Sequence, residues 1–153
     1  MFTLTSPAFK NGERIPKKYS QEGENVSPPL EIAGVPDGAE SLVLFMEDPD
    51  VPKDLKPDGL WIHWVVFNIP PDTKTIPEAT TPPGTSGLGT RKLHTYSGPK
   101  PPDGEHRYMF KLYALNKMLD VSPESMKEDV EKALKGCVIG ETVLMGRFAT
   151  GGE

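Results

Sequence analysis

Cysteine is nearly absent from this 153-residue chain, which contains only Cys137. One cysteine cannot form an intrachain disulfide, so the fold must be stabilised without one. Cys137 stands between Gly136 and the apolar pair Val138-Ile139, and this context favours a small buried hydrophobic residue over a reactive thiol. Such sparse use of cysteine is typical of a reducing cytoplasm, which is the compartment we expect.

Long apolar segments are also missing. No stretch approaches the ~18 consecutive apolar residues that a transmembrane helix requires. Residues 1–7, MFTLTSP, have neither the basic segment nor the apolar core of a secretory signal peptide. We therefore expect no transmembrane segment and no secretion signal.

A surplus of positive charge is lacking as well. The chain has 17 Lys and Arg against 22 Asp and Glu, which gives a formal net charge of −5. A protein of this sign has no general attraction to nucleic acid or to anionic lipid, so neither is an expected partner. This net charge is still compatible with a local cluster of basic residues.

Histidines and the sequence signatures of catalysis are scarce. The 3 histidines are His63, His94 and His106, and no two of them have the spacing of a metal site. Asp48, His63 and His106 would supply a carboxylate and two imidazoles, but nothing in their spacing is specific to a metal. There is no Gly-x-Ser-x-Gly elbow and no phosphate-binding loop. We expect no metal, no cofactor and no enzyme activity.

Glycine and proline, in contrast, are abundant, with 15 and 17 residues. Both break long helices, so the composition excludes helical bundles and favours many short elements joined by turns. A chain of 153 residues with 36% apolar residues is long enough to bury a core. We expect a single domain over residues 1–153.

Four segments have the composition of β-strands. They are rich in apolar, aromatic and β-branched residues, and they span residues 41–46, 61–69, 105–115 and 137–148. Residues 70–104 are predicted to be one long irregular excursion rich in proline. The expected fold is mainly β, a two-sheet antiparallel sandwich, and a helix-layered α/β fold is a distant second.

One helix is predicted near the end of the chain. Ser122 is a suitable N-cap, and Pro123 suits the first helical position. Apolar residues at helical spacing run from Met126 to Leu134, and Gly136 provides the stop. We expect one or two short helices in all.

Asp48 and Asp50 form the first of three polar patches. Pro49 and Pro52 stiffen the segment, so both carboxylates are held in an extended turn after a buried strand. Residues at i and i+2 of an extended segment point to the same side, which suits the binding of donors or a cation. The alternative is an Asx-type turn in which the carboxylates only accept backbone amides.

His63 is the centre of the second patch, in a strand that is apolar on both faces. Strand alternation places Trp61, His63, Val65 and Phe67 on one face. A histidine there must find a partner or remain neutral. It is either a binding residue or a hydrogen-bonded core residue.

The third patch begins the strand at 105–115. Alternation places His106 and Tyr108 on one face and Arg107 on the other. The His and Tyr can jointly donate to a small anion, while Arg107 needs a carboxylate, for which Asp50 is the candidate. The alternative is an ordinary strand with a polar end.

These patches, in this order and with the short motifs around them, resemble the phosphatidylethanolamine-binding protein family in its shorter prokaryotic, Raf-kinase-inhibitor-like branch. The resemblance covers nearly the whole chain. Each motif alone is weak, but the ordered set is specific. The motifs are SPAF (6–9), IP (15–16), SPPL (27–30), VP (35–36), DPDVP (48–52), WIHW (61–64), NIP (68–70), GPKPPDGEHRY (98–108) and FKLYAL (110–115).

The resemblance implies a Greek-key-like β-sandwich with a small pocket for phosphate-like anions or phospholipid headgroups. Carried over by motif, the ligand-binding residues are Asp48, Trp61, His63, Pro102, His106 and Tyr108. Asp50 and Arg107 are supporting residues behind them. His63, His106 and Tyr108 are expected to supply donors to the anion. The segment 87–94 departs from the usual pattern and adds Arg91 and Lys92 near the expected mouth.

The leading functional hypothesis is a non-enzymatic binding protein for a small anion such as phosphate or a phosphoethanolamine-like group. The alternative is a protein-interaction module that inhibits a serine protease or modulates a kinase, with residues 70–104 as the contact surface. A homodimer is compatible with either hypothesis.

Overall fold

The computed structural model describes residues 1–151, and within that range it contains eight strands, one α-helix and one 3-10 turn. The helix α1 spans Lys127–Leu134 and the 3-10 turn spans Lys17–Tyr19. The strands are β1 Thr3–Thr5, β2 Leu30–Ala33, β3 Ser41–Asp48, β4 Trp61–Ile69, β5 Thr75–Ile76, β6 Thr85–Ser86, β7 Glu105–Leu115 and β8 Val138–Ala149.

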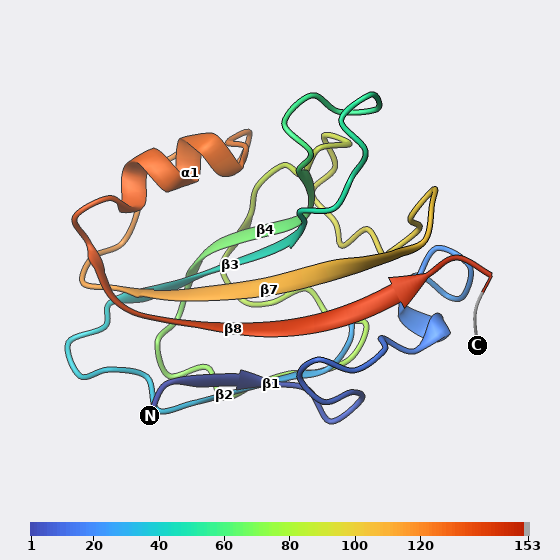
Figure 1. Cartoon of the computed structure of the whole chain (residues 1–153). Coiled ribbons are helices and arrows are strands. Elements are labelled where there is room, and N and C mark those ends of the chain that lie inside the picture. The colour runs from blue at the N-terminus through green and yellow to red at the C-terminus, as the bar shows by residue number, and fades with distance from the viewer. Residues whose placement is uncertain (152–153) are drawn as a thin grey trace.

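The strands form two antiparallel sheets. The larger sheet has the order β6-β4-β3-β7-β8, and the smaller has the order β1-β2-β5. Figure 1 shows the small sheet below the large one and α1 on the opposite face of the large sheet. The predicted two-sheet, mainly β architecture is confirmed.

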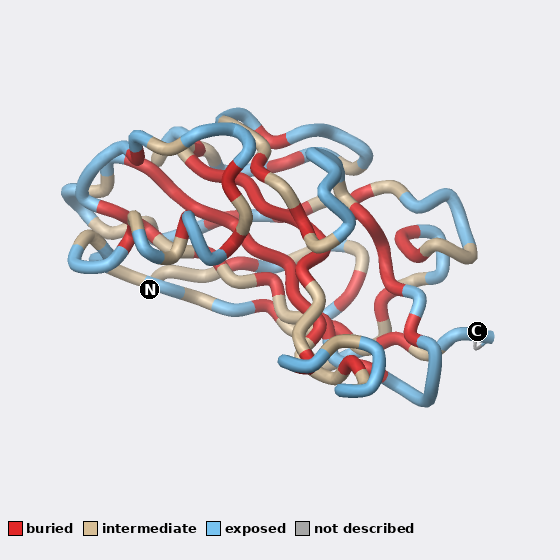
Figure 2. The backbone as a smooth tube through the Cα atoms, turned by 90° about the horizontal axis from the view of Figure 1, so that it is seen from above, coloured by how far each residue is buried: buried red, intermediate tan, exposed pale blue. Residues whose placement is uncertain are grey.

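The central strand β3 is buried along its whole length and separates two apolar clusters. Leu42, Leu44 and Met46 face the small sheet, where they join its core. Val43 and Phe45 face α1 and join the second cluster. Figure 2 shows this buried backbone running through the middle of the molecule, with exposed loops around it.

The four predicted strands are found close to their expected positions, whereas β1, β2, β5 and β6 were not predicted. The strands expected at 61–69 and 105–115 are found with those bounds as β4 and β7. β3 continues beyond the expected 41–46 to Asp48, and β8 runs from Val138 to Ala149. Residues 70–104 are not irregular throughout, because β5 and β6 lie within them and pair with β2 and β4.

The predicted start of the helix was wrong. Ser122 closes a separate turn: its hydroxyl accepts from Glu124 N at 2.9 Å and its carbonyl accepts from Ser125 N at 2.9 Å. Helix α1 begins four residues after Pro123, where the Asp129 carboxylate accepts from Met126 N at 3.0 Å. The predicted apolar stripe is found, since Val130 and Leu134 of α1 are buried.

The end of the helix and the position of Cys137 are close to expectation. Gly136 follows α1 with a φ of +79°, a conformation that glycine adopts without strain. Cys137 is partly buried rather than fully buried, and it packs against the cluster beneath α1. No helix among residues 1–151 is long and apolar enough to cross a membrane.

A β-bulge in β4 changes the predicted alternation at His63. Met46 pairs with Trp64, but the next residue, Glu47, pairs with Ile62, so His63 is an extra residue without an opposite partner. The bulge turns His63 to the same face as Trp64, toward Tyr108, whose ring centroid lies 5.3 Å away. The prediction that His63 shares a face with Val65 and Phe67 was therefore wrong, because those two side chains face α1.

Candidate functional site

A cavity of about 290 Å³ lies where β3 ends, β4 begins and the segment 99–104 enters β7. This volume is near the lower limit of ~300–1,000 Å³ for ligand pockets, so it suits a small ligand or a headgroup. The lining residues are Gln21, Asp48, Val51, Leu55, Trp61, His63, Arg91, Lys100, Pro101, Pro102 and Tyr108.

The structure brings most of the predicted site residues together around this cavity. Five of them line it: Asp48, Trp61, His63, Pro102 and Tyr108. His106 does not belong to the lining, although it contacts Asp48 directly. The three polar patches thus converge, and His106 supports the cavity from behind.

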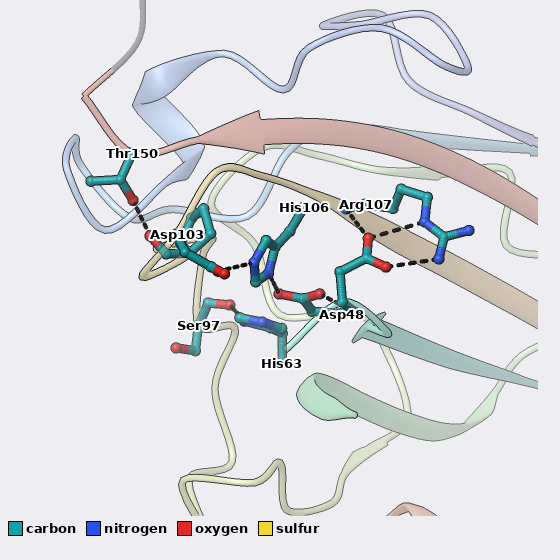
Figure 3. A network of polar contacts seen from close by, with 9 residues as sticks. Asp48, His63, Ser97, Asp103, His106, Arg107 and Thr150 are labelled. Atoms are coloured by element: carbon teal, nitrogen blue, oxygen red, sulfur yellow. Dashed lines mark hydrogen bonds and ion pairs between the residues drawn. The ribbon is translucent and has the colours of Figure 1, made fainter. Parts of the chain in front are cut away.

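His106 is held between two carboxylates. Its Nδ1 lies 2.6 Å from Asp48 Oδ2 and its Nε2 lies 2.8 Å from Asp103 Oδ1, as Figure 3 shows. Burial by itself lowers the pKa of His106, but the hydrogen bonds to the two carboxylates outweigh it and raise that pKa above 6.5. Carboxylates only accept, so the imidazolium form, with a proton on each nitrogen, satisfies both contacts. Both donors of His106 are therefore already in use.

His63 has the opposite character. Its Nδ1 lies 2.7 Å from the Ser97 carbonyl oxygen, which can only accept, so Nδ1 carries a proton. Burial lowers the pKa of His63 to about 4, so the ring is neutral near pH 7. Its Nε2 then carries a lone pair and has no hydrogen-bond partner among residues 1–151. In this state His63 offers the cavity an acceptor, whereas the sequence hypothesis had it supplying a donor.

Hydrogen bonds from the segment at 90–97 fix the position of His63. Ser97 N donates to the His63 carbonyl at 3.2 Å, so Ser97 binds both the backbone and the ring of His63. One residue earlier, Ile62 N donates to Thr90 Oγ1 at 2.7 Å, and Thr90 N donates to the Ile62 carbonyl at 2.9 Å. These contacts hold the neighbouring Arg91 at the cavity.

Tyr108 lines the cavity, and its hydroxyl lies near the Asp48 carboxylate. Its side chain is fully buried, and within the described part of the chain its hydroxyl has no hydrogen-bond partner of good geometry. Burial, followed by the negative charge of Asp48 and the hydrogen-bonding contact with it, raises the pKa of Tyr108 well above its ordinary value. The group therefore remains an O–H donor. A buried donor without a partner costs free energy unless a ligand or water fills that role.

The mouth of the cavity is cationic. Arg91 and Lys100 are exposed residues that reach the lining from two parts of the single connection between β6 and β7. Arg91 was anticipated near the mouth, whereas Lys100 and Gln21 were not singled out. Lys100 stands between Pro99 and Pro101, and that proline-rich context was the only signal in the sequence.

Asp50 and Arg107 form the predicted pair beside the cavity. Arg107 Nη2 lies 2.8 Å from Asp50 Oδ1, Arg107 Nε lies 3.0 Å from Oδ2, and Arg107 N also donates to Oδ2 at 2.8 Å. The hydrogen bond from the guanidinium lowers the pKa of Asp50.

The two carboxylates of the first patch do not act together. Asp48 Oδ1 accepts from Asp50 N at 2.8 Å, which is the Asx-type turn of the alternative interpretation. Because β3 ends at Asp48, the extended geometry stops there, and Asp50 turns to Arg107 instead of the cavity. The expectation of a shared direction was wrong. Among residues 1–151, no group of three or more His, Cys, Asp and Glu side chains is placed to hold a metal ion.

Comparison with known sequences gives a consistent family. The family model described as phosphatidylethanolamine-binding protein matches residues 5–149. A UPF0098 protein of Methanothermobacter thermautotrophicus is 46% identical over 154 residues, which cover 97% of this chain and 99% of the relative. A UPF0098 protein of Chlamydia trachomatis is 45% identical and covers 95% and 97% of the two chains.

Solved structures give the same result. The crystal structure of a phosphatidylethanolamine-binding protein homologue from Chlamydia trachomatis superposes with a TM-score of 0.95, at 44% identity and with 97% of each chain covered. The structure of Escherichia coli YbcL, described as a member of the mammalian family, gives a TM-score of 0.86 at 29% identity and covers 96% and 97% of the two chains. On sequence and on structure, this chain belongs to the phosphatidylethanolamine-binding protein family.

Proposed function

We propose that this protein is a non-enzymatic binding protein whose cavity takes a small phosphate-like anion, free or as part of a headgroup. The observation that carries the proposal is the buried hydroxyl of Tyr108, a donor that lies beside Asp48 without a hydrogen bond of good geometry and belongs to the lining of a cavity with two cations at its mouth. Donors and nearby positive charge are what an oxyanion requires.

The charge distribution supports an anionic ligand. The chain has a net charge of −5, so Arg91 and Lys100 form a local exception at the mouth. The walls are apolar, since Val51, Leu55 and Trp61 line them. Apolar walls exclude water and strengthen the few polar contacts that a ligand makes.

The residues that line the cavity favour binding over catalysis. The lining contains no serine, threonine or cysteine to serve as a nucleophile. His106 is committed through both nitrogens to Asp48 and Asp103, so it has no free position for proton transfer. Cys137 packs beneath α1, on the opposite face of the large sheet.

NMR titration with inorganic phosphate and with phosphoethanolamine tests the proposal directly. The imidazole signals of His63 and His106 are expected to shift saturably, while those of His94, which lies outside the lining, remain still. Tyr108→Phe keeps the ring but removes the donor, so its affinity should fall about tenfold or more. His94→Gln is the matched control and should bind like the unmodified protein.

Absence of any His63 or His106 shift at millimolar ligand would reject the proposal. Attention would then move to residues 70–104 as a contact surface for a protease or a kinase. Vesicles containing phosphatidylethanolamine distinguish the two sources of the anion, because a lipid-headgroup protein binds the vesicles whereas a receptor for free anions does not.

A further inference from the structure

We propose that the cavity selects oxyanions that still carry a proton, such as phosphomonoesters, over unprotonated sulfate and over phosphodiesters. This inference rests on the proposed function and specifies the ligand class of the same site. It separates free phosphomonoesters from intact phospholipids, whose phosphate is a diester and has no acidic O–H.

The inner end of the cavity presents more acceptors than donors. Asp48, His63 and Tyr108 are its buried polar groups, with 3%, 6% and 0% of their surface exposed. Tyr108 has one O–H donor. Asp48 offers the lone pairs that remain beside its hydrogen bonds from Asp50 N and His106, and His63 offers the lone pair of Nε2. An anion with no proton of its own can accept from Tyr108. It has no hydrogen to donate to the two acceptors, Asp48 and His63 Nε2.

The acceptor character of His63 is set by geometry. The carbonyl of Ser97 fixes the proton on Nδ1, 2.7 Å away, so a neutral ring must leave Nε2 bare. A proton on Nε2 would make the ring cationic, and with 6% of the residue exposed that charge is poorly solvated.

The charged groups around His63 come from several elements and nearly balance. Asp48 at the end of β3 is negative, and His106 of β7 is positive between Asp48 and Asp103. Arg91 and Lys100 add positive charge from the β6–β7 connection at the mouth, and Tyr108 of β7 stays neutral. The acceptors therefore lie at the inner end and the cations at the outer end. A bound group needs a donor inside and negative charge outside.

A protonated phosphomonoester meets both requirements. Its P–O–H donates to His63 Nε2 or to Asp48, a second oxygen accepts from Tyr108, and the remaining negative charge faces Arg91 and Lys100. Phosphomonoesters lose this proton with a pKa near ~6, so a large fraction keeps it at mildly acidic pH. Sulfate has nearly the same size and shape but carries no proton there. A phosphodiester has the charge of the monoester monoanion but not its O–H.

Calorimetric titration with four probes tests the selection. They are methyl phosphate, sulfate, dimethyl phosphate and glycerophosphoethanolamine. Methyl phosphate is expected to bind at least tenfold more tightly than sulfate or dimethyl phosphate at mildly acidic pH. Its affinity should fall about tenfold per pH unit once the pH exceeds its second pKa, near ~6, because only the protonated form binds. Above that pH, titration in buffers of different ionisation enthalpy should show uptake of about one proton per bound ligand.

Two variants locate the selection. Asp48→Asn replaces an acceptor with a group that can donate, so the preference for methyl phosphate over sulfate should narrow. Tyr108→Phe removes a donor that every oxyanion uses, so it should weaken all probes alike and keep their ratio. If Asp48→Asn does not fold, the ligand series and the proton count on the unmodified protein still decide the question.

The outcomes separate this inference from the proposed function. Equal binding of sulfate and methyl phosphate, without pH dependence, overturns the selection and leaves the anion-binding function intact. Equal binding of methyl phosphate and glycerophosphoethanolamine also overturns it, because the ammonium group would then be the donor that satisfies the acceptors. Failure of all four probes to bind rejects both proposals.

Discussion

Glu47 and Asp48 are adjacent carboxylates at the end of β3, and both are almost completely buried, with 2% and 3% of their surface exposed. Alternation along the strand sends them to opposite faces of the large sheet. Glu47 lies under α1, where its Oε1 is 2.9 Å from Lys111 Nζ and its Oε2 is 2.6 Å from Lys127 Nζ. Asp48 lies on the other face, bonded to His106 and open to the cavity.

The difference between these two sites is the nature of the partner and the space in front of it. Glu47 is paired with two lysines, and these ion pairs join β3, β7 and α1. Asp48 is paired with a histidine, whose charge can change, and it borders an open volume. Burial of a carboxylate therefore does not by itself identify a binding site.

Removal of Glu47 should have the largest effect on stability. Glu47→Gln leaves the Lys127 ammonium without its closest partner, and the Lys127 side chain is only 8% exposed. We expect the free energy of unfolding to fall by about 3–5 kcal/mol, as for other broken buried pairs. Urea denaturation measures it. Glu131→Gln, which removes a more exposed partner of Lys127 at 3.4 Å, should change stability by no more than about 0.5 kcal/mol. A similar effect of both variants would contradict the structural role given to Glu47.

The cavity face should show a pH dependence that the Glu47 face lacks. The pKa of His63 is lowered by burial from 6.5 to about 4, so between these pH values the unfolded chain binds a proton that the native state does not. Stability must then decrease as the pH falls through this window, by about 3 kcal/mol in total. Denaturation of the unmodified protein and of His63→Gln at several pH values measures the difference in slope. Parallel pH profiles for the two proteins would show that His63 is protonated as easily in the fold as in the unfolded chain.

The four long strands were predictable because local composition determines them, whereas the four strands of two to four residues are too short for such a signal. β4 and β7 are apolar or alternating runs bounded by proline, glycine or asparagine, and their bounds were predicted to the residue. The start of α1 was not predictable, because Ser122 and Pro123 suit a helix N-terminus and an isolated turn equally well. Local signals cannot decide between two structures that use the same capping chemistry.

The site was only partly predictable. Asp48 and His106 are far apart in the sequence, and their meeting depends on the pairing of β3 with β7 and on a contact that only the fold creates. The resemblance to a family supplied this grouping. The bulge at His63 had no sequence signal, since the neighbours of His63 are apolar on both sides and no glycine marks the position. Its protonation state could not be predicted, because it depends on the carbonyl of Ser97, a distant loop residue.

His106 should contribute with the opposite pH dependence to His63. Its pKa is raised because, despite burial, the bonds to Asp48 and Asp103 favour the imidazolium. Its contribution to stability is therefore complete below pH 6.5 and is lost as the pH rises through the higher folded pKa. His106→Gln cannot bridge two carboxylates as a cation, so it should cost about 1–3 kcal/mol at acidic pH and less at alkaline pH. Denaturation of the unmodified protein and of His106→Gln, from acidic to alkaline pH, measures how this cost changes with pH. A cost that stays constant with pH would place His106 with Glu47 as a fixed structural group.

The smallest loss of stability is expected from replacing Asp50. This is so although Asp50 makes more hydrogen bonds to its one partner than Glu47 or Asp48 makes to any one of theirs. Arg107 binds it through three nitrogens, but the two side chains are 27% and 55% exposed, so water and salt screen the attraction. Asp50→Asn should cost about 0.5–1 kcal/mol, and less at high salt. Because the pKa of Asp50 is lowered chiefly by the Arg107 guanidinium, this contribution is present above pH 3.8 and is lost as the pH falls through the lower folded pKa. Denaturation at low and high salt measures it. If Asp50→Asn destabilised the protein as much as Glu47→Gln, the number of hydrogen bonds, and not the burial of the partner, would determine what each carboxylate contributes.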